Sequence, residues 1–238
     1  MDRRSFLGKS AKIGVGLVGG SVLLSACASG DKSGKMTPLR QPGEYYVPEL
    51  PDKAIDGKEL KVGVIGCGGR GSGAVEDLLN AADGIKVTAL GDVFADRLTG
   101  LRENLKTKWN QEVPEDHCFT GFDAYKQVID SGVDMVIVAT PPVFRPAHFQ
   151  HATEKGVHSF LEKPIAVDAK GYRQIMATAK QAEAKGLSVV TGTQRHHQRP
   201  YVESFKKIQE GMIGEITGGN VYWNQGMLWY KERQQGWS

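Results

Sequence analysis

The feature that most restricts the fold of this sequence is the hexapeptide GCGGRG at residues 66–71. It follows an apolar run, Leu60 to Ile65, which has the length and composition of a buried strand. It also opens the segment Arg70 to Ala82, in which apolar residues recur at helical spacing. A glycine turn between a strand and a helix leaves the first N–H groups of the helix free to bind phosphate. The pattern therefore predicts a nucleotide-binding strand–turn–helix unit.

The three glycines of this G-x-G-x-x-G pattern have separate expected roles. Gly66 permits the tight turn, Gly68 lets the backbone approach a pyrophosphate, and Gly71 lets the helix pack closely on the strand. Asp92 lies 21 residues after Gly71, where its carboxylate can accept hydrogen bonds from the adenosine ribose. A carboxylate there repels a 2′-phosphate, so we expect NAD in preference to NADP, although Arg97 could accept that phosphate. A flexible turn is the alternative interpretation, since the chain has 30 glycines.

Strand-like and helix-like segments alternate through the middle of the chain. Strands are expected at 60–65, 85–90, 133–139, 157–161 and 187–192, and helices at 70–82, 96–106, 122–129, 146–155 and 168–185. The last of these helices begins with Asp168 as its N-cap. Strands that alternate with helices form a parallel sheet that is covered on both faces. We therefore predict an α/β fold, a doubly wound parallel sheet of the Rossmann type, over residues 58–192.

The pattern changes after Gly192. A helix is expected at 201–210, followed by a strand at 216–223 that is rich in aromatic and β-branched residues. One helix and one strand cannot bury their own apolar faces. Residues 193–238 are therefore expected to be the beginning of an α+β substrate domain that is incomplete at the end of the sequence.

A proline-rich segment directly follows the strand expected at 133–139. It contains Thr140, Pro141 and Pro142, and it lies at the edge of the sheet where ligands of open α/β folds bind. From the local sequence alone, it either lines a cofactor or forms a rigid crossover turn.

A second segment, Glu162-Lys163-Pro164, follows the strand expected at 157–161. The proline favours an extended conformation for Lys163, which holds the side chain in one direction. A lysine beside a bound nicotinamide can have a lowered pKa, and it could then exchange a proton with a substrate hydroxyl. The alternative is a solvated surface lysine.

Taken together, the glycine turn, the Ala-Thr-Pro-Pro segment and the Glu-Lys-Pro segment resemble one family. That family is the Gfo/Idh/MocA family of NAD(P)-dependent sugar oxidoreductases, and the resemblance covers residues 60–223. It implies that Lys163 is the catalytic or proton-relay residue and that Glu162 lies by the nicotinamide ribose. It also implies that the Thr-Pro-Pro segment lines the nicotinamide.

The segment after Gly192 lies where the family crosses into its substrate domain. The resemblance therefore implies substrate contacts from Arg195 and His197, with a polar linker as the alternative. His196 and His197 are not expected to form a metal site, because neighbours on an extended chain point to opposite sides. The long antiparallel sheet and the Asp/His-bearing helix of the family are missing by Ser238, so the other half of the active site is unassigned.

The function implied by the resemblance is oxidation or reduction at a secondary hydroxyl of a sugar, polyol or glycoside. Because the chain also carries the export signal described below, and little free NAD is expected outside the inner membrane, we expect the NAD to be tightly bound and recycled. One alternative is an NAD-dependent glycoside hydrolase of the same family. Another is a non-catalytic lipoprotein that binds a saccharide, although Lys163 and Asp92 would be needless in a binder. A net charge of +3 without basic runs does not suggest a nucleic-acid partner. A homo-oligomer is compatible with the sequence.

The first 26 residues resemble an export signal. Arg3 and Arg4 precede a short apolar run that ends in Leu-Ser-Ala-Cys27, the order of a twin-arginine signal with a lipoprotein processing site. The apolar run has roughly 14 residues, fewer than the about 20 that span a membrane. We expect a lipid on Cys27, a tether over residues 27–57 and a position on the periplasmic side of the membrane. A buried N-terminal helix with a chance cysteine is the alternative.

The other two cysteines, Cys67 and Cys118, are expected to remain free thiols. A twin-arginine route exports proteins that have folded in the reducing cytoplasm, and Cys67 lies inside the glycine turn. A disulfide between the two is the alternative in an exported protein.

Overall fold

The structure is a computed structural model, and it describes residues 59–226 and 232–233. The predicted export signal with Arg3, Arg4 and Cys27, and the predicted tether, lie outside the described residues. In the described part, no helix has both the length and the apolar character needed to cross a membrane.

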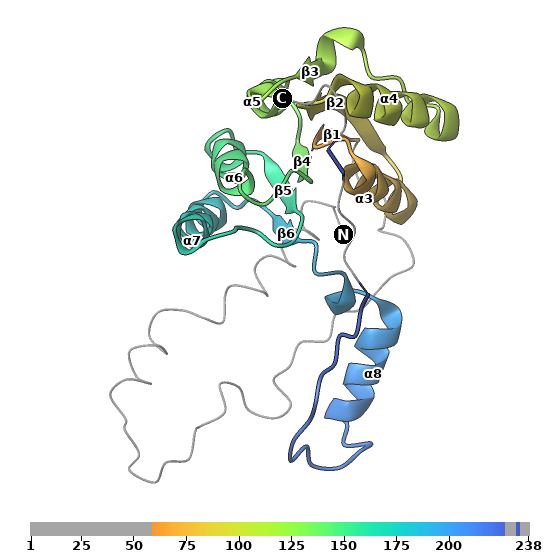
Figure 1. Cartoon of the computed structure of the whole chain (residues 1–238), viewed down its shortest axis with the longest axis vertical. Coiled ribbons are helices and arrows are strands. Elements are labelled where there is room, and N and C mark those ends of the chain that lie inside the picture. Colours follow the sequence, from red (N-terminus) through yellow and green to blue (C-terminus); the bar gives the residue numbers. More distant parts are fainter. Residues whose placement is uncertain (1–58, 227–231, 234–238) are drawn as a thin grey trace.

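Six parallel strands form one sheet in the order β3-β2-β1-β4-β5-β6 (Figure 1). They are β1 (Leu60–Ile65), β2 (Ile85–Asp92), β3 (Cys118–Thr120), β4 (Met135–Val138), β5 (His158–Leu161) and β6 (Val189–Thr191). The chain runs outward from β1 to β3 and then returns to the other side of β1 to form β4. This order confirms the predicted doubly wound Rossmann sheet, and it places the topological switch point between β1 and β4.

Strand β3 is not predicted by the sequence pattern. It has three residues, follows the 3-10 turn η1 (Glu115–His117), and pairs only with the last three residues of β2. Three residues are too few to show an apolar alternation, so pairing with β2 rather than local pattern defines this strand.

Helices cover both faces of the sheet and divide the core in two (Figure 1). One face is covered by α3 (Gly69–Ala81) and α4 (Ala95–Trp109), and the other by α5 (Ala124–Asp130), α6 (Arg145–Glu154) and α7 (Ala169–Ala184). Within β4, Ile137 packs with α3 and α4, whereas Val136 and Val138 pack on the opposite face. Because successive strand side chains point to opposite faces, this one apolar strand contributes side chains to both cores.

Two local predictions are confirmed. Asp168 is the N-cap of α7, and its carboxylate accepts a hydrogen bond from the Gly171 N–H at 2.6 Å. Cys67 and Cys118 are free thiols.

After β6 the chain leaves the sheet. It forms the 3-10 turn η2 (Gln194–His196) and then α8 (Arg199–Gln209), which projects away from the sheet (Figure 1). The strand predicted at 216–223 is wrong, since residues 214–226 have no regular secondary structure. A strand needs a neighbour to pair its backbone N–H and C=O groups, and no described strand pairs with this segment.

Candidate dinucleotide-binding site

The turn between β1 and α3 requires glycine at two positions. Gly66 has a φ of +95°, and a Cβ there would lie 2.8 Å from the Thr140 backbone nitrogen. A Cβ on Gly71 would lie 1.8 Å from the carbonyl oxygen of Gly66, so α3 begins in direct contact with the turn. Gly68 caps α3 without a side-chain bond, and the first turn of α3 holds no acidic residue. The N-terminal N–H groups and the positive end of the helix dipole therefore fit an anion such as a pyrophosphate.

Asp92 ends β2 beside this turn. One of its carboxylate oxygens accepts a hydrogen bond from the Cys67 N–H at 2.7 Å, and the other accepts one from the Phe94 N–H at 2.9 Å. These two bonds fix the carboxylate next to the glycine turn, and each oxygen retains a lone pair for a further donor. The arrangement fits the role toward ribose hydroxyls that the sequence predicts for Asp92.

A guanidinium lies close to the same place. Arg97 stacks over the Phe94 ring, with 5.0 Å between its central carbon and the ring centroid. A Cβ on Gly68 would lie 3.2 Å from one of the Arg97 nitrogens. A carboxylate selects an unphosphorylated ribose and a guanidinium can accept a 2′-phosphate, so Asp92 and Arg97 both bear on the choice of cofactor.

Arg145, the first residue of α6, joins the loops that follow β4 and β5. Its buried guanidinium donates hydrogen bonds to the carbonyl oxygens of Thr140 (2.8 Å), Glu162 (2.6 Å) and Pro164. Burial lowers the pKa of Arg145, and the nearby charge of Glu162 opposes that effect. Because a single planar guanidinium holds both loops, the Thr-Pro-Pro and Glu-Lys-Pro segments keep a fixed relation to each other.

His148 supports the Thr140 loop from the same helix. Its Nδ1 lies 3.2 Å from the Thr140 Oγ1, and its ring stacks on Tyr125 with 4.2 Å between the ring centroids. Burial lowers the pKa of His148 to about 4. The imidazole is therefore neutral at pH 7, and a neutral ring can share one hydrogen bond with the Thr140 hydroxyl.

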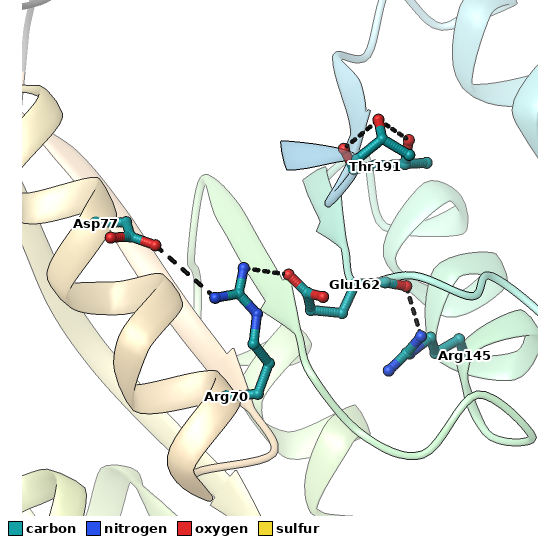
Figure 2. A network of polar contacts seen from close by, with 6 residues as sticks. Arg70, Asp77, Arg145, Glu162 and Thr191 are labelled. Atoms are coloured by element: carbon teal, nitrogen blue, oxygen red, sulfur yellow. Dashed lines mark hydrogen bonds and ion pairs between the residues drawn. The ribbon is translucent and has the colours of Figure 1, made fainter. Parts of the chain in front are cut away.

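Glu162 directly follows β5, and its side chain is only 4% exposed. Arg70, from the first turn of α3, reaches across to it, and their Nη2 and Oε1 atoms are 2.5 Å apart (Figure 2). Gly192 makes room for the carboxylate, because a Cβ there would lie 2.5 Å from the same oxygen. The ion pair therefore links the glycine turn to the ends of β5 and β6.

Lys163 follows Glu162, and its peptide bond to Pro164 is cis. Its side chain is exposed, and no described residue forms a hydrogen bond or ion pair with it. The side-chain amino group of Lys163 is therefore accessible at the edge of the sheet that carries the glycine turn and Asp92.

The predicted cofactor-binding residues form one linked set. Asp92 bonds to the glycine turn, Gly66 lies against the Thr140 loop, and the loops of Thr140 and Glu162 share Arg145. They come from the carboxyl ends of β1, β2, β4 and β5, the edge at which open α/β sheets bind ligands.

Sequence reasoning did not single out Arg70, Arg145 or His148 as parts of this site. Arg70 is part of the GCGGRG hexapeptide, but only the glycines of that hexapeptide were given roles. Arg145 and His148 are three residues apart at the start of α6, a spacing that places both on one helix face. That spacing, directly after the Thr-Pro-Pro segment, is the signal that could have found them.

The two residues predicted to contact substrate lie beyond β6. Arg195 donates from Nε to the Tyr201 hydroxyl at 3.0 Å, and its central carbon lies 4.4 Å from the Trp223 ring centroid. His197 follows η2 and is exposed. Neither forms a hydrogen bond or ion pair with Lys163 in the described structure, and their substrate role stays a prediction. No group of three or more His, Cys, Asp or Glu side chains within 59–226 could hold a metal ion.

Comparison with known proteins agrees with this description of the central unit. The model of an oxidoreductase family with an NAD-binding Rossmann fold matches residues 60–191. A glycosyl hydrolase family 109 protein from Streptomyces coelicolor is 28% identical over 223 residues, which are 92% of this chain and 44% of that protein. An alpha-N-acetylgalactosaminidase from Shewanella oneidensis is 24% identical over 231 residues, 96% of this chain and 47% of that protein. The chain thus spans about half the length of the curated relatives it matches.

Solved structures of the same kind are also similar. Scyllo-inositol dehydrogenase from Lactobacillus casei, with bound NAD(H) and scyllo-inositol, has a TM-score of 0.55 and 25% identity, covering 67% of this chain and 44% of that one. A 3-ketoreductase from Actinomadura kijaniata in complex with NADP has a TM-score of 0.52 and 26% identity, covering 66% and 46%. These two relatives carry different nicotinamide cofactors, so the comparison leaves the choice between NAD and NADP to the residues of the site.

Proposed function

The chain belongs to the Gfo/Idh/MocA family of oxidoreductases with an NAD-binding Rossmann fold, and we propose that it is the cofactor-binding half of an enzyme that uses NAD to oxidise or reduce a secondary hydroxyl of a sugar, polyol or glycoside. One observation carries the proposal. An exposed Lys163 is attached to a buried and fixed Glu162 at the sheet edge that also holds the glycine turn and Asp92.

In this proposal the residues of the chain bind and orient the cofactor. The N-terminus of α3 receives the pyrophosphate, and Asp92 accepts hydrogen bonds from the adenosine ribose. The loop of Thr140, Pro141 and Pro142 borders the nicotinamide, and Glu162 lies by its ribose. When bound, NAD takes up and returns a hydride, which is the redox chemistry that the side chains themselves lack.

Lys163 is the proposed proton relay. Its amino group takes the proton of the substrate hydroxyl during oxidation and returns it during reduction. Arg145 fixes the backbone on both sides of Lys163, through the carbonyls of Glu162 and Pro164, so the direction in which the lysine leaves the backbone is set. A non-catalytic saccharide binder would need no exposed lysine at this position.

A glycoside-cleaving enzyme of the same family is a second candidate. It is favoured by the names of the relatives, a glycosyl hydrolase family 109 protein and an alpha-N-acetylgalactosaminidase. Such an enzyme oxidises its substrate only transiently and regenerates NAD in each turnover. The cofactor-binding residues would be the same, and the difference would lie in the net product.

We also propose that the mature protein is a lipoprotein exported by the twin-arginine route to the periplasmic side of the membrane. The support is the sequence pattern of Arg3, Arg4 and Cys27. A folded protein can be loaded with NAD before export, and free NAD is expected to be scarce outside. The reaction should therefore be redox-neutral overall, with a cofactor that stays bound.

One preparation tests these proposals. The full-length mature protein is purified without added cofactor and dialysed, and its NAD content is measured from ultraviolet absorbance after denaturation. Retained NAD supports the enzyme with a recycled cofactor, whereas a protein that neither holds nor binds NAD would contradict the proposed function. Aryl glycosides then separate the two candidates, because only the hydrolase releases the aryl group. Membrane fractionation with a Cys27→Ser control tests the lipid anchor.

A further inference from the structure

In the described structure the Glu162 carboxylate forms one ion pair, with Arg70, while the nearby Arg145 guanidinium bonds to backbone carbonyls instead. The Glu162 side chain is 4% exposed, and its Oε1 lies 2.5 Å from the Arg70 Nη2 (Figure 2). The backbone of Gly192 packs against the carboxylate, so closely that a Cβ there would lie 2.5 Å from Oε1. A buried carboxylate that loses its cation is strongly unfavourable unless other donors replace it. Arg70 therefore stabilises the charge of Glu162 when no other donor is present.

Arg70 also belongs to the turn that receives phosphate. It is the second residue of α3 and lies between Gly69 and Gly71, in the stretch whose N–H groups face an incoming pyrophosphate. Its side chain is 47% exposed, so the guanidinium can change partners without unfolding the turn. Its other partner, Asp77, is 3.8 Å away and 78% exposed, which makes that pair a weak competitor.

One guanidinium thus pairs with the buried Glu162 and also stands in the turn where the cofactor pyrophosphate is expected. We propose that Arg70 is a positioning residue that exchanges Glu162 for the pyrophosphate when the dinucleotide binds, and that this exchange releases the Glu162 carboxylate for the hydroxyls of the nicotinamide ribose. The proposal rests on the NAD-binding function proposed above. It adds a coupling between the two halves of the cofactor, carried by the Arg70–Glu162 pair.

The coupling produces selectivity for the whole dinucleotide. A ligand that has a diphosphate but no second ribose draws Arg70 away and leaves Glu162 buried without a donor. NAD supplies both groups, so it replaces the lost ion pair with ribose hydrogen bonds. ADP should therefore bind more weakly than its diphosphate alone would allow.

The test measures the dissociation constants of ADP and NAD by calorimetry, on cofactor-free full-length protein. Glu162→Gln frees Arg70 and should tighten ADP binding about 10-fold, the low end for a hydrogen bond between charged groups. NAD should gain much less, because the same substitution weakens the ribose contact. Arg70→Gln should weaken ADP binding about 10-fold, and Arg70→Lys should recover part of that loss. Asp77→Asn is the matched control, with little change expected because Asp77 is exposed.

The double variant decides the matter. In an Arg70→Gln background, Glu162→Gln should no longer affect ADP binding, because the shared cation is gone. If Glu162→Gln leaves ADP binding unchanged while Arg70 is present, or has the same effect without Arg70, the exchange is overturned although NAD binding stands. If the unmodified protein binds neither NAD nor ADP, the proposed function fails and this inference fails with it.

Discussion

Residues 60–191 and residues 193–226 differ in how well the described chain covers their apolar side chains. In the first region, both faces of the sheet are sealed by helices, and the core holds residues such as Val64 and Phe149 that have no exposed surface. In the second, Val202 is the buried residue of α8, while Tyr222 and Trp223 are 75% and 68% exposed. Side-chain positions are thus fixed by many contacts in the first region and by few in the second.

Exposed aromatic rings in the first region include a group at the strand ends. Phe94 follows β2, Phe122 follows β3, and Phe144 precedes α6, and the last two rings have centroids 6.0 Å apart. They lie at the sheet edge that carries the glycine turn. The first region therefore exposes apolar side chains at the place where a ligand is expected, whereas the second region exposes them along its whole length.

The largest expected effect comes from Lys163 in the first region, because the proposed proton transfer depends on it. Lys163→Met should lower turnover of the full-length enzyme by roughly 10²–10⁴, the range for a positioned acid or base. NAD content should hardly change, because other residues hold the cofactor. Lys180→Met, an exposed lysine on α7, is the control. Near-normal turnover of the Lys163 variant would contradict the assignment of the proton relay to Lys163.

A pH titration tests how tightly the first region holds His148. Its pKa is about 4 in the folded protein and about 6.5 in an unfolded chain, so protons favour the unfolded state. The contribution of neutral His148 to the free energy of unfolding should be fully present above pH 6.5. It should fall by up to about 3 kcal/mol as the pH is lowered from 6.5 to 4. His148→Gln, which cannot titrate, should flatten that part of the curve in urea unfolding. Parallel curves for the two proteins would mean that His148 is not buried as described.

A smaller effect is expected from the glycine turn. Gly71→Ala places a Cβ 1.8 Å from the Gly66 carbonyl oxygen, so the turn or the helix must shift. We expect about 1–3 kcal/mol of lost stability, the usual cost of overpacking, together with weaker NAD binding. Gly69→Ala is the matched control, since nothing lies within 4 Å of a Cβ there. Equal melting temperatures and equal NAD affinities for the two variants would contradict the close contact.

The two regions also differ in what their sequences predict. Apart from the three-residue strand β3, the strands and helices of the first region have strong apolar patterns, and the strand expected at Leu60–Ile65 has those bounds in the structure. Contacts between residues that are close in the sequence can also be predicted, as the Asp168 cap of α7 shows. The strand expected at 216–223 fails because β-branched and aromatic residues indicate only that a segment can pair, and pairing needs a partner.

Within the site, the sequence indicated the residues expected to contact the cofactor and missed the residues that hold them in place. Glycines and the Glu-Lys-Pro segment carry a pattern, because the ligand imposes it. Arg145 and Arg70 act through contacts over 17 and 92 residues of sequence separation. Such contacts depend on the order of strands in the sheet, and that order is a property of the whole fold rather than of any segment.

Cofactor choice should change by about 10-fold with Asp92. Asp92→Ala removes acceptors for two ribose hydroxyls and the charge that repels a 2′-phosphate, so the preference for NAD over NADP should narrow by about that factor. Arg97→Ala should shift the preference the other way, since that guanidinium borders Gly68. Fluorescence titration with both cofactors measures the ratio. Tighter binding of NADP than NAD by the unmodified protein would overturn the assignment to Asp92 and favour Arg97.

The smallest expected effect lies in the second region. Trp223→Ala removes the ring that stacks on Arg195 at 4.4 Å, a contact worth about 0.5–1 kcal/mol at an exposed site. Because this contact is among the few that hold residues 194–226 together, amide exchange in α8 should speed up by at most about five-fold. Exchange in β1, and the melting temperature, should stay unchanged, since the core of residues 60–191 does not use Trp223. If exchange at Val62 and Val64 also accelerates, the two regions unfold as one unit, and the contrast between a sealed and an open region no longer describes this protein.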